Sequence, residues 1–86
     1  MDNNLKKIRE DRDLTQKQIS EILGIEQTNY SKYELGKNMM GIDKYMVLAK
    51  FYDVSIDYLC GLTNEPLTLS GSKTFTYKKA NKTTDN

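Results

Sequence analysis

A single glycine between two short amphipathic segments constrains the fold of this chain more than any other feature. The segment before Gly24 opens at Thr15, and Gln18 stands three residues later, which is the capping-box pattern of a helix start. The segment after the glycine runs from about Glu26 to Leu35 and stops at Gly36. Because glycine adopts the positive φ of a sharp turn at little cost, the sequence predicts two short helices joined by a tight turn.

Further start and stop signals predict three more helices. One covers Asn3–Asp11, with Asn3 or Asn4 as its N-cap, and another covers Ile42–Tyr52. A short last helix lies between Ser55, a strong N-cap candidate, and Gly61. Five short helices with brief connections predict an all-α, five-helix domain whose contacts are largely local.

The composition changes once along the chain, near Pro66. We expect residues 1–65 to form the folded domain and residues 66–86 to form a polar, basic tail. The stretch Thr74–Tyr77 alternates polar and aromatic residues, which suggests a short β-strand used in dimerisation. A flexible basic arm that touches DNA and a disordered segment are the two alternatives.

Length and residue types exclude several classes of protein. The chain has 86 residues, enough for one compact domain. It has no His and one Cys, Cys60, so a His/Cys zinc site or a Cys-His or Ser-His catalytic pair cannot form within one chain. We expect a protein without enzymatic activity, metal or cofactor. No apolar run approaches the roughly 20 residues needed to span a bilayer and no secretory signal opens the chain, so we expect a cytoplasmic location.

Basic side chains are not in excess in the predicted domain, and only the tail is basic overall. The formal net charge is +1; residues 1–37 hold seven basic and seven acidic side chains, and residues 67–86 hold four and one. A protein that grips nucleic acid by charge alone needs clustered Lys and Arg. Any nucleic-acid binding by this domain must therefore depend on where a few donors point.

The stretch from Gln16 to Leu35 is the most informative for function. It combines an apolar set at helical spacing with the small Ser20, four residues before Gly24. A generic helical hairpin does not need a small residue there, whereas two helices that approach closely across a tight turn do. This is the pattern of a helix-turn-helix, whose second helix enters the major groove of DNA.

Three stretches carry a likeness to a known family. They read IREDRDLTQKQISEILGI, YSKYELGK and LAKFYDVSIDYLCGLT. On these stretches the chain resembles, from Leu5 to Thr63, the Cro/C1-type helix-turn-helix family of phage repressors and Xre-like regulators. One departure is visible: members of the family often place Pro a few residues after the Gly-Lys at 36–37, and here the loop reads Asn-Met-Met-Gly.

The resemblance implies that the helix after Gly24 is a recognition helix. By position, its base-contacting residues would be Gln27, Thr28 and Lys32. Their chemistry suits this role, because Gln can bond adenine N6 and N7, Lys can donate to guanine, and Thr can contact the thymine methyl. The residues implied to hold the DNA backbone are Gln16, Lys17, Asn29, Lys37 and Asn38. For Glu26 two roles stay open: accepting from cytosine N4, or a favourable charge at the helix N-terminus.

Two further expectations concern the framework. Arg9 and Glu34 match positions that often pair in the family, and we expect a partly buried bidentate ion pair between the first and third helices. Apolar residues of the last helix region exceed what so small a core can absorb, so we expect them to form the surface of a homodimer. This predicted dimer surface comprises Val54, Ile56, Tyr58, Leu59 and Leu62.

Together with the resemblance, these observations predict a transcriptional regulator that binds double-stranded DNA as a homodimer at an inverted-repeat operator, and the resemblance implies that it is a repressor. The alternative is an antitoxin or anti-regulator that uses the same fold mainly to contact a partner protein, because a helix-turn-helix fold does not by itself guarantee DNA binding.

Overall fold

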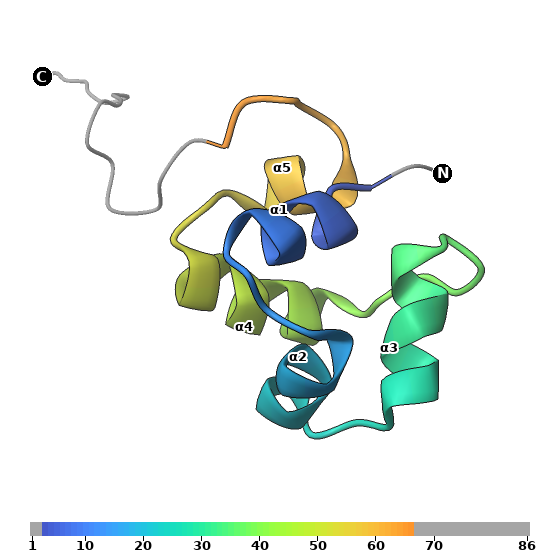
Figure 1. The fold of residues 1–86 in the computed structure, drawn as a ribbon. Coiled ribbons are helices and arrows are strands. Elements are labelled where there is room, and N and C mark those ends of the chain that lie inside the picture. The colour runs from blue at the N-terminus through green and yellow to red at the C-terminus, as the bar shows by residue number, and fades with distance from the viewer. Residues whose placement is uncertain (1–2, 67–86) are drawn as a thin grey trace, which may run out of the picture.

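The computed structural model describes residues 3–66, which form five α-helices (Figure 1). They are α1 (Leu5–Asp11), α2 (Gln16–Leu23), α3 (Gln27–Glu34), α4 (Ile42–Tyr52) and α5 (Ile56–Cys60). This range contains no strand, and the prediction of an all-α, five-helix fold is confirmed. The predictions for the tail, including the strand at Thr74–Tyr77, concern residues outside the described range. Within that range no helix is long and apolar enough to cross a membrane.

Local sequence signals set the two ends of α2. The Thr15 hydroxyl accepts from the Gln18 backbone N–H at 3.1 Å, and the Gln18 side chain accepts from the Thr15 N–H at 2.8 Å, which completes the predicted capping box. At the other end Gly24 has φ 69°, and the Ile25 N–H donates to the Ser20 carbonyl at 3.0 Å. These are the bonds of a glycine-ended helix, and they fix the direction in which the chain leaves α2.

The start of α1 has one of the two predicted N-cap residues, but the side chain of that residue makes a long-range contact instead of a capping bond. Asn4 occupies the N-cap position, but its side chain donates to the carbonyl of Tyr58 at 2.7 Å and to that of Thr63 at 3.3 Å. The side chain of Asn3 instead accepts from the Leu5 N–H at 3.0 Å. Asn4 therefore ties the start of α1 to α5 and to the segment that follows it.

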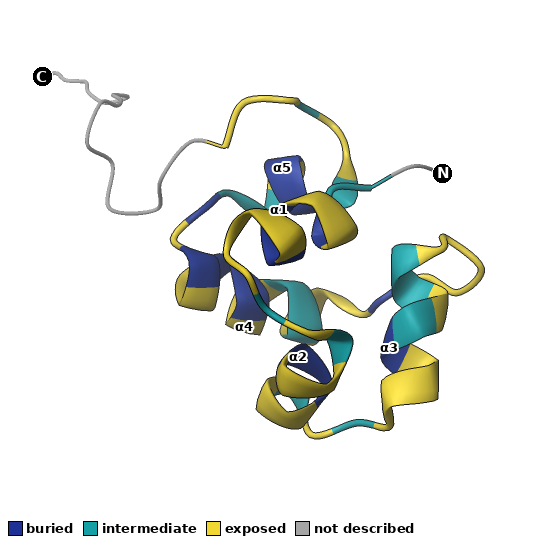
Figure 2. Ribbon diagram, viewed as in Figure 1, coloured by how far each residue is buried: buried dark blue, intermediate teal, exposed yellow. Residues whose placement is uncertain are grey.

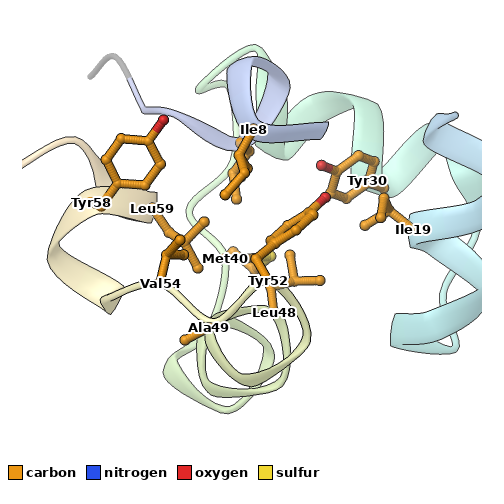
Figure 3. Packing of buried hydrophobic residues seen from close by; sticks show 11 residues of the cluster. Ile8, Ile19, Tyr30, Met40, Leu48, Ala49, Tyr52, Val54, Tyr58 and Leu59 are labelled. Carbon is orange, nitrogen blue, oxygen red and sulfur yellow. The ribbon is translucent and has the colours of Figure 1, made fainter. Parts of the chain in front are cut away.

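A single core joins all five helices and the loop before α4 (Figure 3). Tyr30 of α3 and Tyr52 of α4 are its largest fully buried side chains. Their hydroxyls are buried and have no hydrogen-bond partner among the described residues. The remaining core residues are Leu5, Ile8, Ile19, Met40, Leu48, Ala49, Val54, Tyr58 and Leu59.

Some apolar residues within the helices are exposed. Ile22 on α2 retains 40% of its surface and Met46 on α4 retains 48%. Each lies about a third of a turn from the centre of the face that its helix buries, at 3.6 residues per turn. The buried faces are narrow, because α2 buries Ile19 and Ser20, and α4 buries Leu48, Ala49 and Tyr52.

The strongest helix contacts define two groups, one of α1, α2 and α3 and the other of α4 and α5. α2 packs against α3, α4 packs against α5, and α1 contacts α3. In Figure 1, α3 stands at one edge of the molecule, away from α5. Figure 2 shows that its N-terminal turn is exposed. The N-terminal end of α3 is therefore exposed to solvent, while α1 and α2 pack against the helix.

The capping box of α2 should contribute measurably to stability. We expect Thr15→Ala to lower the free energy of unfolding by about 1 kcal/mol, because it removes the bond to the Gln18 N–H. Urea unfolding followed by circular dichroism measures this change. Thr15→Ser keeps the hydroxyl and serves as the control. Equal losses in the two variants would contradict the capping role.

Candidate nucleic-acid interface

The three residues expected to contact bases lie on α3, with Gln27 at its first position. Gln27, Thr28 and Lys32 are all exposed. Thr28 and Lys32 are four residues apart and so lie one above the other on the helix. Tyr30 points the opposite way and is fully buried. One face of α3 therefore anchors the helix while the other remains open to a ligand.

An ion pair fixes α3 to α1. Arg9 Nε donates to Glu34 Oε2 at 2.6 Å, and Arg9 Nη2 donates to Glu34 Oε1 at 3.1 Å. The Arg9 side chain is 11% exposed and that of Glu34 is 3% exposed. The remaining guanidinium nitrogen, Nη1, donates to the Leu14 carbonyl at 2.9 Å. This is the bidentate pair predicted from the sequence, and its burial keeps water from competing for the bonds.

Glu34 also holds the start of α2. Gln16 Nε2 donates to Glu34 Oε1 at 3.0 Å, which joins the first residue of α2 to the last residue of α3. One carboxylate thus connects α1, α2 and α3. The Gln16 amide carries a second hydrogen that this bond does not use, and the side chain is only partly buried. Gln16 is thus positioned by the protein and still accessible to a phosphate.

The environment of Glu34 favours its charged form. Burial opposes ionisation, but the hydrogen bonds from Arg9 and Gln16 outweigh that effect and lower the pKa of Glu34 below its ordinary value. The neighbouring Tyr30 has its pKa raised, mainly by burial and further by the nearby Glu34 carboxylate. The group at the centre of the three helices is therefore a carboxylate bordered by a neutral phenol.

The remaining residues expected to contact the DNA backbone are all exposed. Lys17 lies on α2, Asn29 on α3, and Lys37 and Asn38 on the loop after α3. The backbone N–H groups of Lys37 and Asn38 donate to the Lys32 carbonyl, at 3.0 and 3.4 Å.

The loop after α3 is held without the proline that related sequences often carry. Its start is tied to α3 through the Lys32 carbonyl, and Met40, further along, is buried in the core. These contacts fix the position of Lys37 and Asn38 relative to the exposed face of α3.

Two features of α3 extend the sequence-based picture. Glu26 is the exposed N-cap residue, and its side chain makes no capping hydrogen bond. Both roles proposed for its carboxylate stay predictions.

Asn3, which the sequence suggested only as a cap, donates through its side-chain amide to the carbonyl of Tyr33 at 2.9 Å. No sequence signal identifies this contact, because the two residues lie 30 positions apart.

The predicted dimer surface needs correction. Val54, Tyr58 and Leu59 are at most 2% exposed, because they fill the core between α4, α5 and α1. They have no surface to offer a partner. Ile56 is partly buried and Leu62 is 69% exposed, so only these two of the five predicted residues remain available at the surface.

The geometry of α2, the turn and α3 is that of a helix-turn-helix unit, and comparison with known proteins agrees. Residues 3–65 match the family model described as a helix-turn-helix domain. The chain therefore belongs to the helix-turn-helix domain family, among the Xre- and Cro-like regulators, and the family predicted from the sequence is confirmed.

Several relatives are known by name. The chain is 40% identical over 62 residues to YobD of Bacillus subtilis, an uncharacterized HTH-type transcriptional regulator, covering 72% of this chain and 55% of YobD. It is 34% identical over 90 residues to YqaE of the same organism, which is described in the same terms, covering 95% of this chain and 78% of YqaE. It is also 38% identical over 47 residues to RstR, a cryptic phage CTXphi transcriptional repressor of Vibrio cholerae, covering 55% of this chain and 42% of RstR.

The chain thus spans about half the length of YobD and less than half that of RstR. A crystal structure of a transcriptional regulator from Listeria innocua has a similar fold, with a TM-score of 0.66 and 28% sequence identity. That match covers 76% of this chain and 64% of the Listeria protein.

The ion pair between Arg9 and Glu34 should matter more for stability than a surface pair. We expect Arg9→Met to lower the free energy of unfolding by about 3 to 5 kcal/mol, because it leaves a buried carboxylate without its partner. The double variant Arg9→Met, Glu34→Leu should recover much of this loss, since neither charge is then buried. Urea unfolding of the three chains tests the prediction. A double variant as unstable as Arg9→Met would contradict it.

The lowered pKa of Glu34 predicts a loss of stability in acid. As pH falls below 4.5, the ordinary value for this carboxyl, the unfolded chain binds a proton that the folded chain resists. The stabilisation from the charged form is present above that pH and is lost as pH falls further toward the folded-state pKa. We expect the free energy of unfolding of Glu34→Gln to fall less steeply with decreasing pH than that of the wild type. Urea unfolding from about pH 7 down to about pH 3 measures this dependence. Equal slopes in the two proteins would rule out this role.

Proposed function

We propose that this chain is a sequence-specific DNA-binding transcriptional regulator, acting as a repressor, that binds an inverted-repeat operator as a homodimer. The observation that carries the proposal is the division of α3 into an anchored face with Tyr30 and Glu34 and an exposed face with Thr28 and Lys32. Membership of a family whose relatives include transcriptional regulators and a phage repressor supports it.

In this proposal α3 lies in the major groove and its exposed side chains contact base edges. Gln27 offers a donor and an acceptor for adenine, Lys32 a donor for guanine, and Thr28 a methyl group for thymine. Each good contact discriminates against a wrong base by about 1 to 3 kcal/mol. Three such contacts in each subunit would give useful specificity to a protein whose net charge is only +1.

The backbone contacts would fix the register of α3 on the duplex. Gln16 stands at the first position of α2, where backbone N–H groups and the helix dipole favour a phosphate oxygen. Its bond to Glu34 links that phosphate contact to the end of α3. Lys37 and Asn38 would hold the DNA backbone from the loop beyond α3, with Lys17 and Asn29 adding further contacts. Such contacts set position rather than sequence preference.

Selection of bound sequences from random duplex DNA tests the proposal. At fixed salt we expect the wild-type chain to enrich an inverted repeat and the double variant Gln27→Ala, Lys32→Ala to lose that enrichment. The matched control is Lys50→Ala, Asn64→Ala, which removes one exposed amide and one exposed lysine outside α3. The control should enrich the same repeat as the wild type.

Removing a phosphate contact should affect DNA binding differently from removing a base contact. Lys37→Ala should weaken binding to all sequences alike and reduce the dependence of log K on log salt by about 0.9. Failure of the wild-type chain to enrich any sequence would reject operator binding. That outcome would favour the alternative, an antitoxin or anti-regulator that acts mainly on a partner protein.

A further inference from the structure

The outer side of α4 is apolar in its middle and charged at its two ends. Four exposed residues form it and line a shallow hollow of about 250 Å³: Asp43, Met46, Val47 and Lys50. The two apolar members, Met46 and Val47, are 48% and 44% exposed. The opposite side of α4 is buried in the core. We call these four residues the α4 outer face.

The order of the charges gives the α4 outer face a particular symmetry. Asp43 lies in the first turn of α4 and Lys50 in the last. Because they are seven residues apart, they lie within about 20° of one line along the helix and about 10.5 Å from each other. Met46 and Val47 lie between them, one on each side of that line. The acidic end and the basic end are therefore equally far from the apolar centre, so the face is complementary to a copy of itself turned end for end.

The position of each charge also has a local explanation. A carboxylate in the first turn and an ammonium group in the last turn both favour the helix dipole. Lys44 Nζ lies 3.7 Å from Asp43 Oδ2, but the Asp43 side chain is 78% exposed, and such a pair contributes little. These effects account for the signs of the charges. They do not account for the two exposed apolar side chains between them, and an apolar centre with a charged rim is typical of a protein contact.

Two α4 helices can pair through this face in only one direction. When they run antiparallel about a two-fold axis, Met46 and Val47 of the two copies meet at the centre, and Asp43 of each copy faces Lys50 of the other. The steps of three and four residues between Asp43, Met46 or Val47, and Lys50 match the spacing of a seam between packed helices. A parallel pair would place like charges opposite each other, so the charges select the antiparallel arrangement.

The α4 outer face is separate from the surface predicted for the homodimer. The exposed residues of that surface, Ile56 and Leu62, line a different hollow, which contains none of the four residues of the α4 outer face. Pairing through α4 therefore leaves Ile56 and Leu62 available, and one chain can make both contacts at once.

We propose that the α4 outer face binds the same face of a chain in a second homodimer, so that two homodimers join through one antiparallel pair of α4 helices. This inference rests on the proposed function for the homodimer, but not on DNA binding. α4 has 11 residues and offers one side, so the contact is small and of the weak, reversible class. The competing occupants are residues 67–86 of the same chain and an unrelated protein.

Sedimentation equilibrium of the 86-residue chain without DNA, at low salt and rising concentration, tests this inference. We expect the mass of the wild type to rise from that of a dimer toward that of a tetramer. Asp43→Lys and Lys50→Asp should each weaken the association of dimers by at least about tenfold, because each places two like-charged pairs in the contact. The double variant Asp43→Lys, Lys50→Asp should restore association, because opposite charges face each other again.

The double variant also separates pairing from helix stability. It loses both charges that favour the helix dipole, so its helix should be the least stable of the three variants although it associates best. Circular dichroism should show that all of them are folded. The matched controls are Lys6→Asp and Asp57→Lys, which reverse exposed charges on α1 and α5. Both controls should associate as the wild type does.

The apolar centre is tested by a separate substitution. Met46→Glu places two carboxylates beside the two-fold axis and should abolish the tetramer while leaving the dimer. Its matched control is Leu35→Glu, at a residue that is 67% exposed and lies outside the α4 outer face. This control should form tetramers as the wild type does.

The outcomes separate this inference from the proposed function. A wild-type chain that never exceeds a dimer would overturn the inference, and so would a double reversal that fails to restore association. Single reversals that convert dimers into monomers would assign α4 to the homodimer itself and would also overturn it. Dimers that associate through α4 but enrich no DNA sequence would support the inference and reject DNA recognition. Dimers that enrich an inverted repeat and never associate further would do the reverse.

Discussion

The carboxylate of Glu34 is the contact on which the arrangement of the first three helices depends. It accepts from Arg9 on α1 and from Gln16 on α2, and it is itself the last residue of α3. A buried carboxylate is costly unless its lone pairs are used. Here the hydrogen bonds from Arg9 and Gln16 offset the free-energy cost of burying the charge. The same bonds fix the orientation of the three helices.

The limits of each helix followed closely from local sequence signals. α4 has the predicted bounds, and the capping box at Thr15 and the turn at Gly24 are present as expected. These signals act over three or four residues and need no knowledge of the rest of the fold. Asn4 is the N-cap of α1, one of the two residues predicted for that position, but its side chain makes no capping bond and donates to carbonyls more than 50 positions away.

Burial and long-range contacts were less accessible to sequence reasoning. Helical spacing identifies an apolar stripe, but the neighbouring helices decide how wide a stripe each helix buries, which is why the apolar Ile22 of α2 is exposed. The same difficulty affected the dimer surface, since an excess of apolar residues around α5 does not reveal which of them, such as Leu59, the core absorbs. The pair between Arg9 and Glu34 was predicted through family resemblance, whereas the bond from Gln16 to Glu34 was not.

The separation of the two faces of α3 has a consequence for how a chain like this diversifies. The side chains of Gln27, Thr28 and Lys32 are exposed and make no hydrogen bond among the described residues, while Tyr30 and Glu34 carry the contacts to the domain. Exposed substitutions of this kind usually change stability by less than about 0.5 kcal/mol. New combinations at these three exposed positions can therefore be sampled almost freely. Under the proposed function, lineages with one scaffold can thus acquire different target sites through a few point mutations, without first gaining stability to tolerate them.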